Sequence, residues 1–241
     1  MLQGLYSAAA GMAAQQQRID ALSNDVANVN TAGYKRQRLD FRDLAYQDVP
    51  TGNGVRAGAG AAVTSAGRSM AGGSIETTGQ ALDVAIEGDG FIPVRRADGS
   101  AALTRAGALR INAERQLVTA TGERVQPAIT IPQDAALDDV SIAADGTVSA
   151  LGRPVGRIQL QDVPAPQGLL AAGDNLVVPT EASGAPRNAT GTIRQGALER
   201  SNVDIAEAMT ELMEAQRSYT MASRVIQTQD QLMEIANGVK R

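Results

Sequence analysis

Few residues of this chain have the types and spacing that catalysis requires. Gly88, Asp89 and Gly90 resemble part of a phosphate-binding loop, in which backbone amides at the start of a helix hold the anion. Neither a helical pattern nor a suitably placed lysine follows them, so we expect no nucleotide site. Asp138 and Asp139 are adjacent in the sequence. Adjacent strand residues point to opposite sides, so this pair predicts solvated loop charges and not an acid/base pair.

Side chains for thiol or imidazole chemistry are missing. The sequence contains no Cys and no His, which removes thiol nucleophiles, thiolate metal sites and the commonest general base. Met209, Met213, Met221 and Met233 fall within one expected helix, where methionine most simply serves packing. The sequence therefore predicts a protein that is not an enzyme and that binds no cofactor or metal.

Charge and hydropathy exclude several classes of partner. The net charge is −4 and the basic residues form no cluster, so we expect no nucleic-acid surface. No apolar run approaches the ~20 residues of a membrane span, so we expect no membrane insertion. No basic residue precedes Arg18, and polar residues interrupt the first apolar run. This pattern does not fit a cleaved secretory leader.

Two helical stretches, one at each end of the chain, must position the remainder. Residues 201–241 repeat apolar side chains with the 3.5-residue period of a coiled-coil seam, and no Gly or Pro falls between Asn202 and Asn237. Asp204 and Glu207 predict a capped start for this helix. Residues 1–30 carry a matching stripe. The large seam residues are Leu5, Met12, Ile19, Leu22, Val26 and Val29 in the first helix, and Ile205, Leu212, Tyr219, Ile226 and Met233 in the second.

The second helix carries more apolar surface than one partner helix can cover. The first helix has only three charges, although a surface helix normally turns a charged face to water. We therefore expect both seams, together with Met209, to form contacts with neighbouring copies. Head-to-tail contacts do not close on themselves, and they grow into helical tubes. The alternative, a compact domain around a buried helix, needs more apolar surroundings than the other segments offer. The surplus apolar residues are Met209, Met213, Met221, Val225, Leu232 and Ile235.

Two amides, Gln15 and Gln229, interrupt the apolar seams. A polar residue at a seam position can fix the register of paired helices at a cost in stability. We predict that replacing either residue with Leu leaves the assembled tube stable but loosens its register. Helical parameters measured by cryo-electron microscopy test this prediction, and unchanged parameters would contradict it.

Between the helices the sequence pattern changes twice. Leu39 to Gln80 is rich in Gly and Ala, which predicts an extended arm, or plain disorder in the isolated chain. Residues 81–200 show short alternating runs, and Asp98-Gly99 and Asp145-Gly146 each separate two runs in the manner of β-hairpins. The expected strands are 91–96, 101–104, 116–121, 125–131, 140–143, 147–149, 155–161, 175–179 and 193–198.

The sequence therefore predicts an α+β protein with a discontinuous helical domain. Its N- and C-terminal helices, 1–38 and 201–241, form a coiled-coil-like pair. Residues 39–80 form the arm. Residues 81–200 form an inserted, irregular antiparallel β domain.

The end of the first helix carries a family resemblance. Residues 23–36 read SNDVANVNTAGYKR, a helix that ends in an Asn-rich turn followed by Gly, an aromatic residue and a basic pair. This stretch resembles the N-terminal signature of the bacterial flagellar rod and hook proteins. Further blocks in the family's order lie at 83–91, 103–107, 198–204 and 214–219. The motif residues are Asn24, Asn28, Thr31, Gly33 and Tyr34.

The resemblance implies a structural subunit of the flagellar basal-body rod, polymerised into a hollow shaft that transmits torque to the hook. The implied partners are further copies, other rod proteins, the hook, the surrounding P- and L-ring proteins and the flagellar export apparatus. The implied location is the rod that spans the periplasm, reached by type III export without a cleaved leader.

Several alternatives remain open at this point. Residues 126–132 and 201–203 resemble distal rod proteins, which we favour, whereas 142–149 and 207–209 resemble proximal ones. The arm segment 51–79 is also shorter than is usual for a distal rod protein. A hook or hook-junction protein is expected to have a larger outer region. A secreted β-domain enzyme or wall-binding module is expected to have a cleft lined by paired acids.

Overall fold

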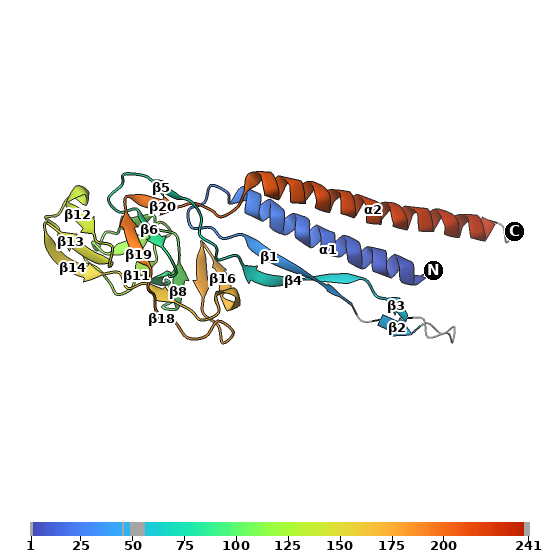
Figure 1. Cartoon of the computed structure of the whole chain (residues 1–241), viewed down its shortest axis with the longest axis horizontal. Helices are drawn as coiled ribbons and strands as arrows, with labels where there is room; N and C mark the ends of the chain where they lie inside the picture. Colours follow the sequence, from blue (N-terminus) through green and yellow to red (C-terminus); the bar gives the residue numbers. More distant parts are fainter. Residues whose placement is uncertain (1, 45, 49–55, 239–241) are drawn as a thin grey trace. The chain divides into compact units, whose positions relative to one another are not determined.

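The computed structural model describes residues 2–44, 46–48 and 56–238 (Figure 1). The chain divides into two compact units. We call the first the helical unit: Met1–Ala27, Gln37–Ala66 and Asp204–Arg241. We call the second the β unit: Asn28–Arg36 and Gly67–Val203. The chain therefore crosses between the units after Ala27, Arg36, Ala66 and Val203.

Two long helices dominate the helical unit. Helix α1 spans Leu2–Ala27 and helix α2 spans Ile205–Gly238, and the two pack together in opposite directions (Figure 1). Asp204 begins α2, since its carboxylate accepts hydrogen bonds from Ala206 N at 2.8 Å and Glu207 N at 3.1 Å. The predicted pairing of the terminal helices, with antiparallel β-structure inserted between them, is confirmed.

Short strands of the arm complete the helical unit. Strand β1 (Gln37–Asp43) pairs with β4 (Ala61–Arg68), and β2 (Tyr46–Asp48) pairs with β3 (Arg56–Gly58). Gly60 approaches α1 so closely that a Cβ would lie 2.9 Å from Ala10 Cβ. The described part of residues 39–66 therefore forms β-ribbons in the helical unit, whereas residues 67–80 of the predicted arm belong to the β unit. Residues 45 and 49–55 of the predicted arm lie outside the described residues.

The β unit is built on a seven-stranded antiparallel sheet with the order β16-β17-β8-β7-β11-β10-β9. A three-stranded sheet, β12-β13-β14, and three strand pairs, β19-β6, β15-β18 and β20-β5, surround it. The strands up to β11 are β5 (Ile75–Thr77), β6 (Val84–Glu87), β7 (Ile92–Arg95), β8 (Ala101–Thr104), β9 (Leu109–Ile111), β10 (Leu117–Thr119) and β11 (Arg124–Val125). The later strands are β12 (Val140–Ile142), β13 (Thr147–Ala150), β14 (Arg153–Arg157), β15 (Gln161–Asp162), β16 (Leu170–Gly173), β17 (Leu176–Val178), β18 (Arg187–Asn188), β19 (Thr192–Gln195) and β20 (Ala197–Glu199).

Small aliphatic side chains fill the core of the β unit. Ile92, Val125 and Val148 are fully buried within one large cluster. A smaller cluster surrounds Phe91 and Leu103. At ~1.5 to 3 kcal/mol for each large side chain, such burial is the main favourable term that holds these short strands together.

Both predicted hairpins are present, but three of the expected runs are reduced to one strand residue or divided between two strands. Strands β7 and β8 flank Asp98-Gly99, and β12 and β13 flank Asp145-Gly146. Of the expected strand 125–131, only Val125 lies in a strand, β11, and a cis Gln126-Pro127 bond follows. The run 155–161 is shared by β14 and β15. The run 193–198 divides at Gly196, which has φ +71°, because β19 pairs with β6 and β20 pairs with β5.

Candidate functional site: a junction cluster and exposed helix faces

Three charged side chains meet in the interior of the β unit, and we call them the junction cluster: Lys35, Arg105 and Glu199. Their side chains are 5%, 6% and 2% exposed, respectively. Lys35 Nζ lies 2.5 Å from Glu199 Oε1, and Arg105 Nη1 lies 3.3 Å from both carboxylate oxygens. Residues far apart in the sequence are thereby fixed to one carboxylate.

Backbone groups supply further hydrogen bonds to the cluster. Lys35 Nζ also donates to Ala71 O at 2.8 Å, and Gly73 N donates to Glu199 Oε1 at 2.9 Å. Arg105 Nε and Nη2 donate to the carbonyls of Gly90 at 3.0 Å and Gly88 at 2.7 Å. The glycine loop that resembled a phosphate site thus turns carbonyl oxygens toward a guanidinium. Those two carbonyls serve a cation and not an anion.

The electrostatics of the junction cluster depend on Glu199. Burial lowers the pKa of the Lys35 ammonium below its ordinary value, while the hydrogen bond and charge of Glu199 act in the opposite direction. Two cations share a single buried carboxylate, so Glu199 is the group whose loss leaves uncompensated charge.

The junction cluster lies close in sequence to three of the chain crossings. Lys35 precedes the crossing after Arg36 by one residue. Ala71 and Gly73 follow the crossing after Ala66, and Glu199 precedes the crossing after Val203. The cluster therefore ties together, inside the β unit, chain segments that continue into the helical unit.

The predicted seam of α1 lies largely on its covered side. Leu22 is buried, and Leu5, Met12, Ile19 and Val26 are half-buried. Val29 is half-buried in the turn beyond the end of the helix. The exposed residues of α1 form a different arc: Tyr6, Ala9, Ala13, Gln16, Gln17, Asp20, Ser23, Asn24 and Ala27.

The predicted seam of α2 is less evenly covered. Its small residues Ala208 and Ala215 are buried, which permits close approach of another backbone. The larger residues Leu212, Ile226 and Met233 are half-buried. Ile205 is 51% exposed and Tyr219 is 38% exposed.

The surplus apolar residues of α2 are exposed, between 43% and 63%, and we call them the outer face of α2. A series of large apolar side chains along one helix, open to water, is typical of an interaction surface. Its residues are Met209, Met213, Met221, Val225, Leu232 and Ile235.

The two seam amides lie apart within the helix pair. Arg18 and Glu214 form an ion pair at 3.8 Å and so lie at the same level of the antiparallel helix pair. Counting from this pair, Gln15 lies at about the level of residue 217 of α2. Gln229 lies at about the level of residue 3 of α1. At 1.5 Å per residue the two amides are about 18 Å apart along the axis. Gln15 Oε1 is buried and has no hydrogen-bond partner among the described residues. The two amides therefore cannot bond to each other within one helix pair. A role for either of them in fixing the register would need a partner other than the second amide, and this role stays a prediction.

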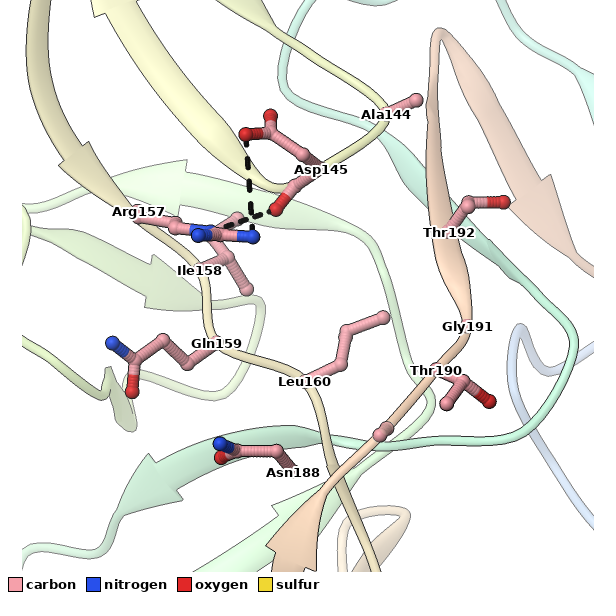
Figure 2. Close-up of a pocket in the computed structure, with 11 residues that line it drawn as sticks. Ala144, Asp145, Arg157, Ile158, Gln159, Leu160, Asn188, Thr190, Gly191 and Thr192 are labelled. Atoms are coloured by element: carbon pink, nitrogen blue, oxygen red, sulfur yellow. Dashed lines mark hydrogen bonds and ion pairs between the residues drawn. The ribbon is translucent and has the colours of Figure 1, made fainter.

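A surface cavity of about 550 Å³ lies on the β unit between residues 157–160 and 188–192. Figure 2 shows Asp145 beside Arg157 at one end, with Arg157 Nε donating to Asp145 O at 2.9 Å. Asp145 is the one carboxylate among the lining residues. Hydrogen bonds from Thr147 N and Thr147 Oγ1 hold the pKa of Asp145 below its usual value. A single ionised carboxylate does not supply the acid/base pair that the enzyme alternative requires.

The predicted loop charge Asp139 lies in a turn of the β unit. Asp139 ends a short 3-10 turn, Leu137–Asp139, and its exposed carboxylate accepts a hydrogen bond from Ala136 N at 3.1 Å. In the part of the chain that the structure describes, no group of His, Cys, Asp or Glu is arranged to hold a metal ion. None of the described helices is long and apolar enough to cross a membrane.

Comparison with known proteins identifies the family. Residues 5–35 match the flagella basal body rod protein family, and 194–239 match the C-terminal region of flagellar basal body rod FlgEFG proteins. Residues 85–150 match the D1 domain of the flagellar hook protein FlgE/F/G family. The chain is also 38% identical over 266 residues to the flagellar basal-body rod protein FlgG of Borreliella burgdorferi, an alignment that covers 100% of both chains. The chain belongs to the flagellar basal-body rod protein family.

Two further relatives support this membership over the whole chain. The flagellar basal-body rod protein FlgG of Caulobacter vibrioides is 41% identical over 265 residues, covering 99% of this chain and 100% of the relative. The protein of the same name from Agrobacterium fabrum is 39% identical over 263 residues, covering 98% of each chain. As a member of the rod family, the chain is a structural subunit of the flagellar basal-body rod and not an enzyme. The predicted family is confirmed.

The rod-family motif forms the turn that leads from α1 into the junction cluster. Thr31 Oγ1 donates to Asn28 Oδ1 at 3.2 Å, and Gly33 N donates to Glu199 O at 2.8 Å. Tyr34 is 4% exposed, and the Arg68 guanidinium lies 5.1 Å from its ring centroid. Asn24 lies on the exposed side of α1. The motif thus fixes the backbone that directly precedes Lys35.

Gly33 is the motif position with the strictest backbone requirement. Its φ is +72°, and a Cβ there would lie 2.6 Å from Arg105 C and Ala106 N. We predict that Gly33→Ala lowers the free energy of unfolding of the β unit by about 1–3 kcal/mol, because strain and backbone contact add. Denaturant unfolding measures the change. The matched control is Gly11→Ala in α1, where a Cβ has no neighbour within 4 Å. This substitution should stabilise the helix by about 0.5–1 kcal/mol, and equal losses in both variants would contradict the assignment.

Sequence reasoning did not single out the three members of the junction cluster. Each of them stands in a block that resembles the rod family, namely 23–36, 103–107 and 198–204. A signal was present, since these separate blocks supply a lysine, an arginine and a glutamate. The sequence alone did not show that the three would meet.

Proposed function

We propose that the chain is the distal rod subunit and that it polymerises head-to-tail into a hollow helical shaft. Its further partners are then the proximal rod proteins, the hook, the surrounding P- and L-ring proteins and the flagellar export apparatus. The shaft carries torque from the motor across the periplasm to the hook.

The outer face of α2 is the observation that carries this proposal. Full burial of a large apolar side chain contributes about 1.5–3 kcal/mol, so six such residues left in water represent a large unused association energy. One partner helix already covers the other side of α2. Neighbouring copies are the simplest partners to bury this face, because every copy contains the same pair of helices.

The distal assignment rests on the relatives. Those described above carry the name FlgG and align over nearly their whole length with this chain. The blocks at 126–132 and 201–203 favour the same assignment, and the short arm argues against it.

The junction cluster fits the task of transmitting torque. In a turning shaft, force passes between the helices and the β-structure through the covalent chain. Buried ion pairs resist separation, because breaking one leaves an uncompensated charge in the interior. We propose that the cluster keeps the chain crossings fixed under load.

Assembly of the purified full-length chain tests the proposed function. Circular dichroism and limited proteolysis are compared at low and high concentration. We expect the termini of the dilute chain to be cut readily, and the assembled chain to gain both helix signal and protection. A chain whose ends are fully protected at every dilution, with no change on concentration, would contradict the proposal and favour the compact domain.

A further inference from the structure

The exposed arc of α1 is unusual for a helix that faces water. Tyr6 is 73% exposed at one end of the arc, and Asp20 near the other end supplies its only charge. Between them the arc carries Ala9, Ala13, Gln16 and Gln17. Small side chains allow another helix to approach closely, while Tyr6 projects from the surface.

A shallow hollow on α2 has the complementary character. It is lined by Met213, Gln216, Arg217, Thr220, Met221 and Arg224. Neither the Arg217 nor the Arg224 guanidinium forms an ion pair or a hydrogen bond with the described residues. Two free cations on an apolar helix face require a negatively charged partner surface, or they remain in water.

We propose that, in the polymer, the exposed arc of α1 lies along the outer face of α2 of a neighbouring copy, with Asp20 seated between Arg217 and Arg224. This inference deepens the proposed polymerisation and rests on it. The occupant is a second copy of this chain, because the arc supplies the acid and the small side chains that the hollow lacks.

The direction of docking follows from the arrangement within one copy. Helices α1 and α2 are antiparallel in each copy. Copies that repeat along a helical shaft keep nearly the same orientation, so α1 of one copy runs antiparallel to α2 of the next. Every α1 then lies between its own α2 and a neighbour's, a head-to-tail contact that propagates.

A second point of contact supports this register. Tyr6 precedes Asp20 by 14 residues, or about 21 Å of helix. Counting the same distance along α2 from the midpoint of Arg217 and Arg224 reaches Leu232 and Ile235. Both are among the most open apolar residues of α2, at 54% and 63% exposed. Antiparallel docking thus brings Tyr6 onto apolar residues at the same time as it pairs Asp20.

Cysteine cross-linking of the polymer tests the docking directly. The chain has no native Cys, so Tyr6→Cys chains and Ile235→Cys chains are mixed in equal amounts, assembled and oxidised. We expect a cross-linked species of two chains that approaches half of the material, the maximum for a random equal mixture, because the proposed docking brings the two Cα atoms within reach of a disulfide. The matched control replaces the second chain with Met209→Cys, which parallel docking would bring beside Tyr6, and we expect at least tenfold less product.

Charge reversal supplies an independent readout in the same assembly. We expect Asp20→Arg, or Arg217→Glu with Arg224→Glu, to raise the concentration needed for assembly at least tenfold. Combining the three changes should restore it to within about threefold of the unsubstituted chain. Asp134→Arg and Arg153→Glu, at exposed positions of the β unit, serve as controls.

The outcomes separate the inference from the proposed function. Absence of any polymer from the unsubstituted chain would overturn the proposed polymerisation and this inference with it. Normal polymer with no Tyr6–Ile235 product, or with charge reversals that change nothing, would overturn the docking alone.

Discussion

Replacing Glu199 with Gln will lower the free energy of unfolding of the β unit by about 3–5 kcal/mol, because it leaves two buried cations beside a neutral amide. The carboxylate accepts hydrogen bonds from Lys35, Arg105 and Gly73, and its side chain is 2% exposed. Hydrogen exchange of the core amides of β6 to β8, followed in increasing denaturant, measures the loss.

The control for this prediction is Glu181→Gln, an exposed glutamate of the β unit. It should change the stability by no more than about 0.5 kcal/mol. Lys35→Met in the Glu199→Gln background should recover part of the loss, since it removes one of the uncompensated charges. If Glu199→Gln and Glu181→Gln behave alike, the junction cluster does not hold the β unit together.

Replacing Met221 and Val225 together with Glu will raise the concentration at which the chain assembles at least ~100-fold. Two carboxylates would replace apolar contact area and compete with the neighbour's Asp20 for Arg217 and Arg224, and a loss of about 2.7 kcal/mol already corresponds to a factor of one hundred. The two side chains are 61% and 56% exposed. The free energy of unfolding of the dilute chain should therefore change by no more than about 0.5 kcal/mol. Sedimentation across a concentration series measures assembly.

Leu170→Glu is the matched control, because Leu170 is an equally open apolar residue, 63% exposed, in the β unit. It should shift the assembly concentration by less than about threefold. An equal rise of the assembly concentration in the helix variant and in this control would show that exposed apolar area in general, and not the outer face of α2, governs association.

The helices could be predicted from the sequence because their information is local. A repeat of 3.5 residues, an Asp at the cap and the absence of Gly and Pro within the run act over neighbouring turns. The exposure of the surplus apolar residues of α2 could also be predicted. They lie outside the seam, and a single partner helix covers only the seam side.

The hairpins were predictable for the same local reason, and the divided strands were not. An Asp-Gly turn between two alternating runs specifies its own partner strands. The run 193–198 looked like one strand because its residue types are suited to a strand throughout. It breaks at Gly196 because its halves pair with β6 and β5, which are brought together only by the tertiary fold.

The junction cluster lies beyond the reach of pattern reasoning. Lys35 and Glu199 are 164 residues apart in the sequence, and Arg105 and Glu199 are 94 apart. A lysine, an arginine and a glutamate on a surface would look the same in the sequence. Their burial depends on how the turn after α1, the residue after β8 and the end of β20 converge.

The central claim is that the terminal helices are assembly surfaces that reach their most stable state among copies of the same chain. Electron cryo-microscopy of the concentrated full-length protein tests it most directly. We predict hollow tubes whose inner layer consists of α1 and α2, with each outer face of α2 covered by a neighbour. Particles that remain single at every concentration, with both termini protected from protease, would contradict it.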